Sequence, residues 1–229
     1  MNTSLITTCT LAVASGFAMA EKPSLTTSGQ ILDRPIYVGD RGLDICGVEV
    51  YSGNASCDTV TTSGVSCGTS TDTAVNSVAR PLPGFPGGAV ACVDLGFETV
   101  SGGAGAGMVI ELYSDDDGIP NVAGMTLLGS VTADIPDGDN QIARVTFDAP
   151  IECPAGNLVV VANYADLNPG LVFHGGDTAT DGIETYILAD TCSIGEYTTM
   201  TDIGFAGSDW TVCLSLAGDF DPCDFPLGS

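Results

Sequence analysis

Positive charge is scarce in this chain. Five lysine and arginine residues stand against 29 aspartate and glutamate residues, which gives a formal net charge of −24 at pH 7. A surface this acidic repels the phosphates of nucleic acids and the headgroups of anionic lipids. The sequence also lacks an unbroken hydrophobic run of about 18 residues, the length that crosses a bilayer as a helix. We therefore expect no nucleic-acid partner and no transmembrane segment.

Histidine is almost absent too, which limits metal and nucleophile chemistry. His174 is the only histidine, and no two cysteines have the C-x-x-C spacing of a thiolate zinc site. Residues 64–68 match the G-x-S-x-G pattern of a hydrolase nucleophile elbow, with Ser66 at the centre. That motif requires a strand before it and a helix after it, and the surrounding sequence predicts neither. We therefore expect a protein that is not an enzyme.

Cysteine, by contrast, is plentiful, and it follows a segment typical of exported proteins. Residues 1–20 carry no charged side chain and end in Ala18-Met19-Ala20, which predicts a signal peptide cleaved before Glu21. Cleavage removes Cys9 and leaves eight of the nine cysteines, an even number that suits an oxidising compartment. The residues predicted to form disulfides are Cys46, Cys57, Cys67, Cys92, Cys153, Cys192, Cys213 and Cys223.

The sequence leaves the disulfide connectivity open, because eight cysteines can pair in about 105 ways. Cys57 and Cys67 are the best local pair, since both lie in one segment rich in serine, threonine and glycine. Cys92 and Cys213 fall on the polar faces of their predicted strands. Such positions favour cross-links at the surface of a sheet over thiols in the core.

The hydrophobic pattern predicts an all-β protein. Apolar residues alternate with polar ones in residues 91–98, 108–113, 143–148 and 210–216, as in a sheet with one wet face. Residues 158–162 are apolar at every position, which predicts a central strand covered on both faces. Short strands separated by turn-rich segments indicate a single antiparallel β-sandwich, jelly-roll-like and cross-linked by disulfides.

We divide the chain into a signal peptide at 1–20, an N-terminal extension and irregular region at 21–87, a sandwich at 88–218 and a C-terminal tail at 219–229. The irregular region is expected to pack on the sandwich. Residues 136–140 are expected to join the strands before and after them like a hairpin loop. The N-terminal part of the extension is a candidate for self-association, because an extended segment can add a strand to the sheet of a neighbouring subunit.

Acidic turns supply the best candidates for metal binding. Asp115, Asp116 and Asp117 precede a glycine, and adjacent carboxylates on such a turn offer the hard oxygen ligands that Ca²⁺ prefers. Asp137 and Asp139 form a second, looser candidate. Both groups can equally be solvated turns, in which aspartate favours the turn geometry. Calcium is therefore the one cofactor that the sequence suggests.

Exposed aromatic rings would favour carbohydrate binding, and the sequence offers few of them. Trp210, the single tryptophan, shares an alternating face with apolar residues, which predicts a place in the core. Tyr113, Tyr164 and Tyr186 remain as candidate exposed rings. These three tyrosines keep a glycan-binding function open.

One block of sequence resembles a known family. Residues 110–120 read IELYSDDDGIP, and they are followed by LLGS at 127–130, VTF at 145–147 and PAGNLVV at 154–160. This order is similar to secreted bacterial β-sandwich domains of the choice-of-anchor type, over roughly residues 88–217. The resemblance implies a lectin-like jelly roll on an exported protein. Its motifs are signatures of turns and strands, so they indicate a fold and not an activity.

These observations together predict a protein that is secreted or lies at the cell surface. We expect a non-catalytic role in adhesion, matrix or surface assembly, with self-association or a surface glycan as the partner. The alternative is a carbohydrate-binding module, assisted by calcium at residues 115–117.

Overall fold

The computed structural model describes most of the chain from residue 76 onwards and short segments before it. The described residues are 11–13, 36–38, 46–52, 57, 60, 64–68, 74, 76–121, 123–164, 170–177 and 182–217. Most of the predicted signal peptide, most of the N-terminal extension and the predicted tail, which holds Cys223, therefore lie outside them.

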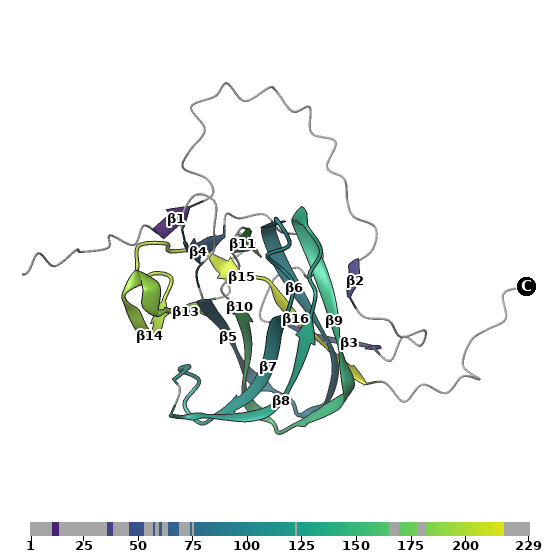
Figure 1. The fold of residues 1–229 in the computed structure, drawn as a ribbon. Coiled ribbons are helices and arrows are strands. Elements are labelled where there is room, and N and C mark those ends of the chain that lie inside the picture. The colour runs from purple at the N-terminus through teal and green to yellow at the C-terminus, as the bar shows by residue number, and fades with distance from the viewer. Residues whose placement is uncertain are drawn as a thin grey trace, which may run out of the picture.

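Two sheets pack face to face in a β-sandwich (Figure 1). Sheet I contains, in spatial order, β14 (Ile194–Thr199), β13 (Tyr186–Ala189), β5 (Asn76–Phe85), β10 (Gly156–Tyr164), β7 (Met108–Asp115) and β8 (Met125–Ala133). Sheet II contains β2 (Ile36–Val38), β9 (Gly138–Cys153), β6 (Gly88–Ser101), β16 (Val212–Ala217) and β3 (Cys46–Ser52), and β11 (Leu171–His174) also pairs with β6. The predicted all-β sandwich is confirmed.

Short elements complete the fold at one end of the sandwich. They are the pair of β1 (Leu11–Val13) with β4 (Val65–Cys67), the pair of β12 (Gly176–Asp177) with β15 (Asp209–Trp210), and the 3-10 turn η1 (Asp190–Cys192). The described pairings are antiparallel except that of β2 with β9, which is parallel. β1 falls inside the predicted signal peptide.

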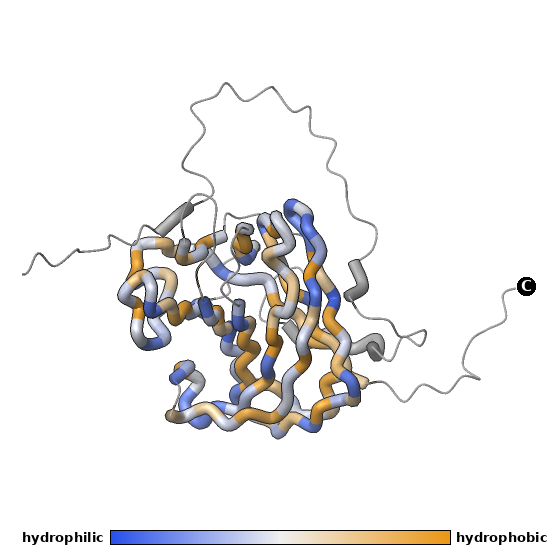
Figure 2. The backbone as a smooth tube through the Cα atoms, in the orientation of Figure 1, coloured by the Kyte–Doolittle hydropathy of each residue, from blue (hydrophilic) through white to orange (hydrophobic). Residues whose placement is uncertain are grey.

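Alternation along the strands places the core between the two sheets. Ile110 and Leu112 of β7 and Val93 and Leu95 of β6 are fully buried there, and Figure 2 shows hydrophobic residues recurring along the paired strands. Burying one such side chain stabilises the fold by about 1.5–3 kcal/mol. Trp210 is also fully buried, and its indole N–H donates to the carbonyl of Gly96 over 3.0 Å. Its predicted core position is confirmed.

The continuous apolar run in β10 has the predicted explanation. Leu158, Val160 and Ala162 belong to the core between the sheets, whereas Val159 and Val161 belong to a smaller buried cluster on the outer face of sheet I. β10 lies between β5 and β7, so both of its edges are paired and both of its faces are covered. A strand in this position needs apolar side chains at successive residues.

The expected hairpin around residues 136–140 is wrong. β8 pairs with β7 in sheet I, and β9 pairs with β6 in sheet II, so the chain crosses from one sheet to the other between them. Local turn signals mark where the chain reverses but do not say which strand will become the partner.

The sandwich begins before residue 88. β5 starts at Asn76 and pairs with β10 on one edge and β13 on the other, in the middle of sheet I. The sequence did not predict this strand, because it has prolines at positions 81 and 83 and proline is depleted in central strands. The predicted boundary therefore leaves out a central strand.

The disulfides correct the predicted local pairing. Cys57 bonds to Cys213 and Cys67 bonds to Cys192, across sequence separations of 156 and 125 residues. Cys57 and Cys67 are close in sequence, but the chain between them carries one to β16 and the other to η1. Cys92 is also disulfide-bonded, so Cys92 and Cys213 both form cross-links as predicted, but both are fully buried and do not lie at the surface.

Cys153 departs from the expectation that every mature cysteine is paired. It is a free, buried thiol at the end of β9, and burial raises its pKa to about 11. A thiol with such a pKa stays protonated and unreactive near neutral pH.

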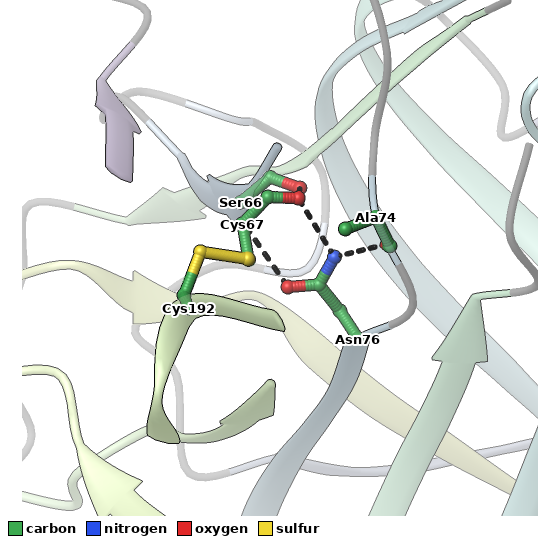
Figure 3. The surroundings of a disulfide bond; sticks show 5 residues. All are labelled: Ser66, Cys67, Ala74, Asn76 and Cys192. Atoms are coloured by element: carbon green, nitrogen blue, oxygen red, sulfur yellow. Dashed lines mark hydrogen bonds between the residues drawn. A yellow bond between two sulfur atoms is a disulfide. The ribbon is translucent and has the colours of Figure 1, made fainter. Parts of the chain in front are cut away.

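The Asn76 side chain hydrogen-bonds to the backbone of Cys67, beside the Cys67–Cys192 bond, in the way that a neighbouring strand would (Figure 3). Asn76 accepts a hydrogen bond from the Cys67 N–H over 2.9 Å and donates one to the Cys67 carbonyl over 3.1 Å. It donates another to the Ala74 carbonyl over 2.5 Å. One amide thus fixes β4 against the first residue of β5, and the disulfide then ties β4 to η1.

None of the helical segments described is both long and apolar enough to cross a membrane.

Candidate functional site

The outer face of sheet I carries a group of tyrosines around a small apolar floor. Ala79, Val159 and Val161 are buried there although they point away from the core of the sandwich. Four partly buried residues pack against this floor: Tyr113, Met125, Tyr186 and Tyr197. We call the surface formed by Tyr113, Tyr186, Tyr197, Glu111, Asn163 and Ser77 the tyrosine face.

Strand register explains why residues so distant in sequence meet. Tyr186 lies opposite Ala79, Ala79 lies opposite Val161, and Val161 lies opposite Glu111. These four residues form one row across β13, β5, β10 and β7. Because side chains alternate between the faces of a sheet, a row of paired residues lies on the same face.

A chain of hydrogen bonds links the polar members of the face. One carboxylate oxygen of Glu111, Oε2, accepts from the hydroxyl of Tyr113 over 2.9 Å and from the amide nitrogen of Asn163 over 2.6 Å. The amide oxygen of Asn163 accepts from the Ser77 hydroxyl over 2.5 Å. The network therefore runs across three neighbouring strands of sheet I, from β7 through β10 to β5.

The tyrosine hydroxyls of this face remain protonated at physiological pH. Burial raises the pKa of Tyr113, and its hydrogen bond to Glu111 and the charge of Glu111 raise it further. Burial raises the pKa of Tyr197 to about 12, with a contribution from Glu111. All three tyrosines can thus donate a hydrogen bond, since the pKa of Tyr186 is also raised by burial and nearby carboxylates.

A buried arginine positions Tyr186. Arg80 is fully buried on β5, where its guanidinium donates to the Ile183 carbonyl and lies 3.4 Å from both Thr185 Oγ1 and Asp209 Oδ1. The backbone N–H of Trp210 donates to the same Thr185 hydroxyl over 2.8 Å. These contacts fix the segment that enters β13, and the first residue of β13 is Tyr186.

The acidic turn at residues 115–117 borders the tyrosine face. Asp115 and Asp117 are close enough to Tyr186 for their charges to raise the pKa of its hydroxyl. Asp116 and Asp117 are exposed, and Asp117 accepts a hydrogen bond from the Ile119 N–H over 2.9 Å. The following Gly118 has a φ of +75°, the left-handed conformation that glycine tolerates.

Asp115 differs from its two neighbours because it is buried, with 5% of its surface exposed. Its pKa is raised chiefly by burial, and the nearby backbone amides of Asp116 and Asp117 offset this only in part. Among the described residues, neither buried carboxylate oxygen of Asp115 has a hydrogen-bond partner. A buried carboxylate in this state is costly and favours a cation or a proton.

Asp137 and Asp139 lie at the other end of β7. Ala133, which precedes this acidic loop, pairs with Met108 at the start of β7, whereas Asp115 is the last residue of β7. The length of β7, about 23 Å, therefore separates the two acidic groups. Asp137 accepts from the Gly103 N–H and Asp139 accepts from the Thr99 hydroxyl, each over 3.0 Å. The structure thus keeps the two predicted groups apart. Across the part of the chain that is described, no three histidine, cysteine, aspartate or glutamate side chains gather closely enough to hold a metal.

Ser66 and His174 do not form a nucleophile and base. The Ser66 hydroxyl is buried and hydrogen-bonds to the Cys67 carbonyl over 3.5 Å. His174 is buried beside Trp210, with neither ring nitrogen hydrogen-bonded, and burial lowers its pKa to about 3. The segment around Ser66 is the short strand β4 of an antiparallel pair, which is not the strand–turn–helix that a nucleophile elbow requires.

The sequence found part of the tyrosine face. Tyr113 and Tyr186, two of the three candidate exposed rings, lie on it and are partly buried, whereas Tyr164 is fully buried in the core. Tyr197, Asn163 and Ser77 were missed. Glu111 had a detectable signal, because it alternates with apolar residues on the same predicted strand as Tyr113.

Comparison with known proteins assigns no family to this chain. No protein-family model and no curated protein matches the chain. Two similar solved structures are of Cwp84, a surface-layer associated protein of Clostridium difficile. One contains its cysteine protease and lectin-like domains, with a TM-score of 0.45 and 16% identity over 72% of this chain and 35% of that chain. The other is the protease after propeptide cleavage, with a TM-score of 0.41 and 16% identity over 62% of this chain and 36% of that chain. This chain thus spans about a third of each structure.

Proposed function

We propose that this protein is an exported, non-catalytic binding domain that works outside the cell, in adhesion, matrix or surface assembly. The observation that supports this proposal is the tyrosine face. Three tyrosines and a hydrogen-bonded carboxylate lie together on a rigid sheet, with each strand of that sheet fixed by its neighbours. Rings of this kind offer an apolar body and a polar tip, which suits reversible contact with a partner.

The disulfides support an extracellular setting. Bonds that close loops of 125 and 156 residues form and persist in oxidising compartments. The predicted signal peptide points the same way.

Binding to cells tests this function. The labelled chain from Glu21 to Ser229 would be incubated with intact cells or extracellular matrix of its source and then washed. We expect retention that falls in a Tyr113→Ser/Tyr186→Ser variant and is unchanged in Glu152→Gln, an exposed substitution at the end of β9. Equal retention of all three proteins would refute the role of this face.

Calcium binding at the acidic turn is a second candidate function, favoured by the unpartnered carboxylate of Asp115. Asp115, Asp117 and the amide oxygen of Asn157 would supply three oxygens, and backbone carbonyls or water would supply the rest. Asn157 is opposite Asp115 in the sheet, and its Cγ would lie 3.4 Å from a Cβ placed at Gly118. An ion there would order the turn at the edge of the tyrosine face.

A further inference from the structure

The tyrosine face leaves hydrogen-bonding groups unused. Glu111 accepts two bonds through Oε2, and no hydrogen bond from the described residues reaches Oε1. The amide nitrogen of Asn163 uses one of its two hydrogens on Glu111. Both groups lie beside Tyr113, because the Glu111 carboxylate that Asn163 contacts also accepts from the Tyr113 hydroxyl.

The apolar part of the face continues beyond Tyr113. Leu127 on β8 lies opposite Tyr113 and is 49% exposed, one of two large hydrophobic side chains exposed to this degree in the described residues. The other, Ile119, is 56% exposed in the turn that borders the face. Leu127 thus extends the apolar surface of the face across β8.

We infer that the tyrosine face binds a neutral carbohydrate. The inference rests on the proposed binding function and names its ligand. A sugar ring has an apolar C–H face that packs on an aromatic ring, and hydroxyls that both donate and accept. Glu111 Oε1 would accept from one hydroxyl, and the free hydrogen of Asn163 would be donated to another. The polar groups are already held by their neighbours, which lowers the entropic cost of binding.

The absence of positive charge selects a neutral ligand. In the described residues the cationic side chains are Arg80, which is buried in the core, and Arg144, which pairs with Asp94 in sheet II. Among the described residues, therefore, no cation on the tyrosine face can balance a uronate, a sulfate or a phosphate. Glu111 and the bordering acidic turn would repel such groups, so acidic polysaccharides are expected to bind weakly.

Titration calorimetry with soluble oligosaccharides tests the inference. The panel contains neutral β-1,4-linked gluco-, manno-, xylo- and chito-oligosaccharides, one oligogalacturonate and one oligolysine peptide. We expect at least one neutral oligosaccharide to bind, oligogalacturonate to bind more weakly, and Tyr113→Ala and Glu111→Gln each to reduce affinity about tenfold or more. Tyr113→Phe keeps the ring and removes its bond to Glu111, so it should lose less than Tyr113→Ala.

Tyr164→Phe is the matched control, because Tyr164 is buried in the core and its hydroxyl has no partner. Its affinity should equal that of the parent protein.

Two outcomes overturn the carbohydrate inference. Oligolysine binding that requires Glu111, without oligosaccharide binding, leaves the binding function standing and assigns a basic peptide as ligand. Oligosaccharide binding that survives every substitution on the face places the sugar elsewhere. Loss of cell retention in Tyr113→Ser/Tyr186→Ser, measured separately, decides whether the face is a contact surface at all.

Discussion

Arg144 and Asp94 form a two-pronged ion pair between adjacent strands of sheet II. Nε and Nη2 of Arg144 each lie 2.7 Å from one carboxylate oxygen of Asp94, and the two residues are directly opposite in the register of β9 and β6. Their side chains are 15% and 5% exposed. Geometry of this kind is strong because two parallel bonds share the charge, and water screens it little.

Breaking this pair should destabilise the fold without affecting the tyrosine face. We expect Arg144→Met to lower the free energy of unfolding by about 2–4 kcal/mol, because it leaves the Asp94 carboxylate buried and uncompensated. Urea denaturation measures the loss. A double variant with Asp94→Leu should recover part of it, and a fully additive loss would show that the two residues do not stabilise each other.

His174 should make the protein less stable in acid. Its pKa is about 3 in the folded protein, where burial disfavours the charged ring, and about 6.5 when unfolded. Between these values the unfolded chain takes up a proton that the folded protein does not. The free energy of unfolding should therefore fall by about 1.4 kcal/mol for each pH unit between pH 6 and pH 4.

The variant His174→Phe isolates this contribution, because Asp115 and Glu98, whose pKa values are raised, act in the opposite direction in both proteins. Urea unfolding should be measured at several values from pH 7 to pH 4. The free energy of unfolding should fall less steeply with pH in the variant, by about 1.4 kcal/mol for each pH unit. Parallel curves for the two proteins would mean that His174 is accessible to protons in the folded state.

The two mapped disulfides should differ in their effect on binding. Cys192 lies between Tyr186 and Tyr197 in sequence, so its bond to Cys67 fixes the hairpin that carries both rings. We expect Cys67→Ser/Cys192→Ser to lower the free energy of unfolding by about 2–4 kcal/mol, the range typical of disulfides that close long loops, and to weaken ligand binding. Cys57→Ser/Cys213→Ser removes the bond between β16 of sheet II and Cys57, and it should lose stability but keep its affinity. Equal loss of affinity in both variants would contradict this assignment.

Calcium should stabilise the protein through Asp115. We expect millimolar CaCl₂ to raise the melting temperature of the parent protein and to have no effect on Asp115→Asn, whose side chain carries no charge. Asp139→Asn is the control, because Asp139 lies at the opposite end of β7 and its carboxylate already accepts from Thr99. The same increase in Asp115→Asn as in the parent would exclude a site at this turn.

Local pattern was enough to identify β6, β7, β9 and β10, although it missed the central strand β5. Alternation along β6, β7 and β9 followed directly from which residues are apolar, and the unbroken run in β10 showed that this strand is central. Each of these inferences depends on neighbours within one strand, and a strand's side chains alternate whatever its partner is. Calcium binding, the choice-of-anchor resemblance and the signal peptide stay predictions.

The partners of these strands were decided by the tertiary structure. Cys57 pairs with Cys213 and not with Cys67, and β9 pairs with β6 and not with β8. The tyrosine face arises in the same way. Tyr113 was visible in the sequence, but its meeting with Asn163 through Glu111 depends on the register of β10 against β7. Composition and alternation determine which segments form strands. Sheet order and register decide which side chains share a surface, because a shift of one residue would turn each side chain of a strand to the opposite face.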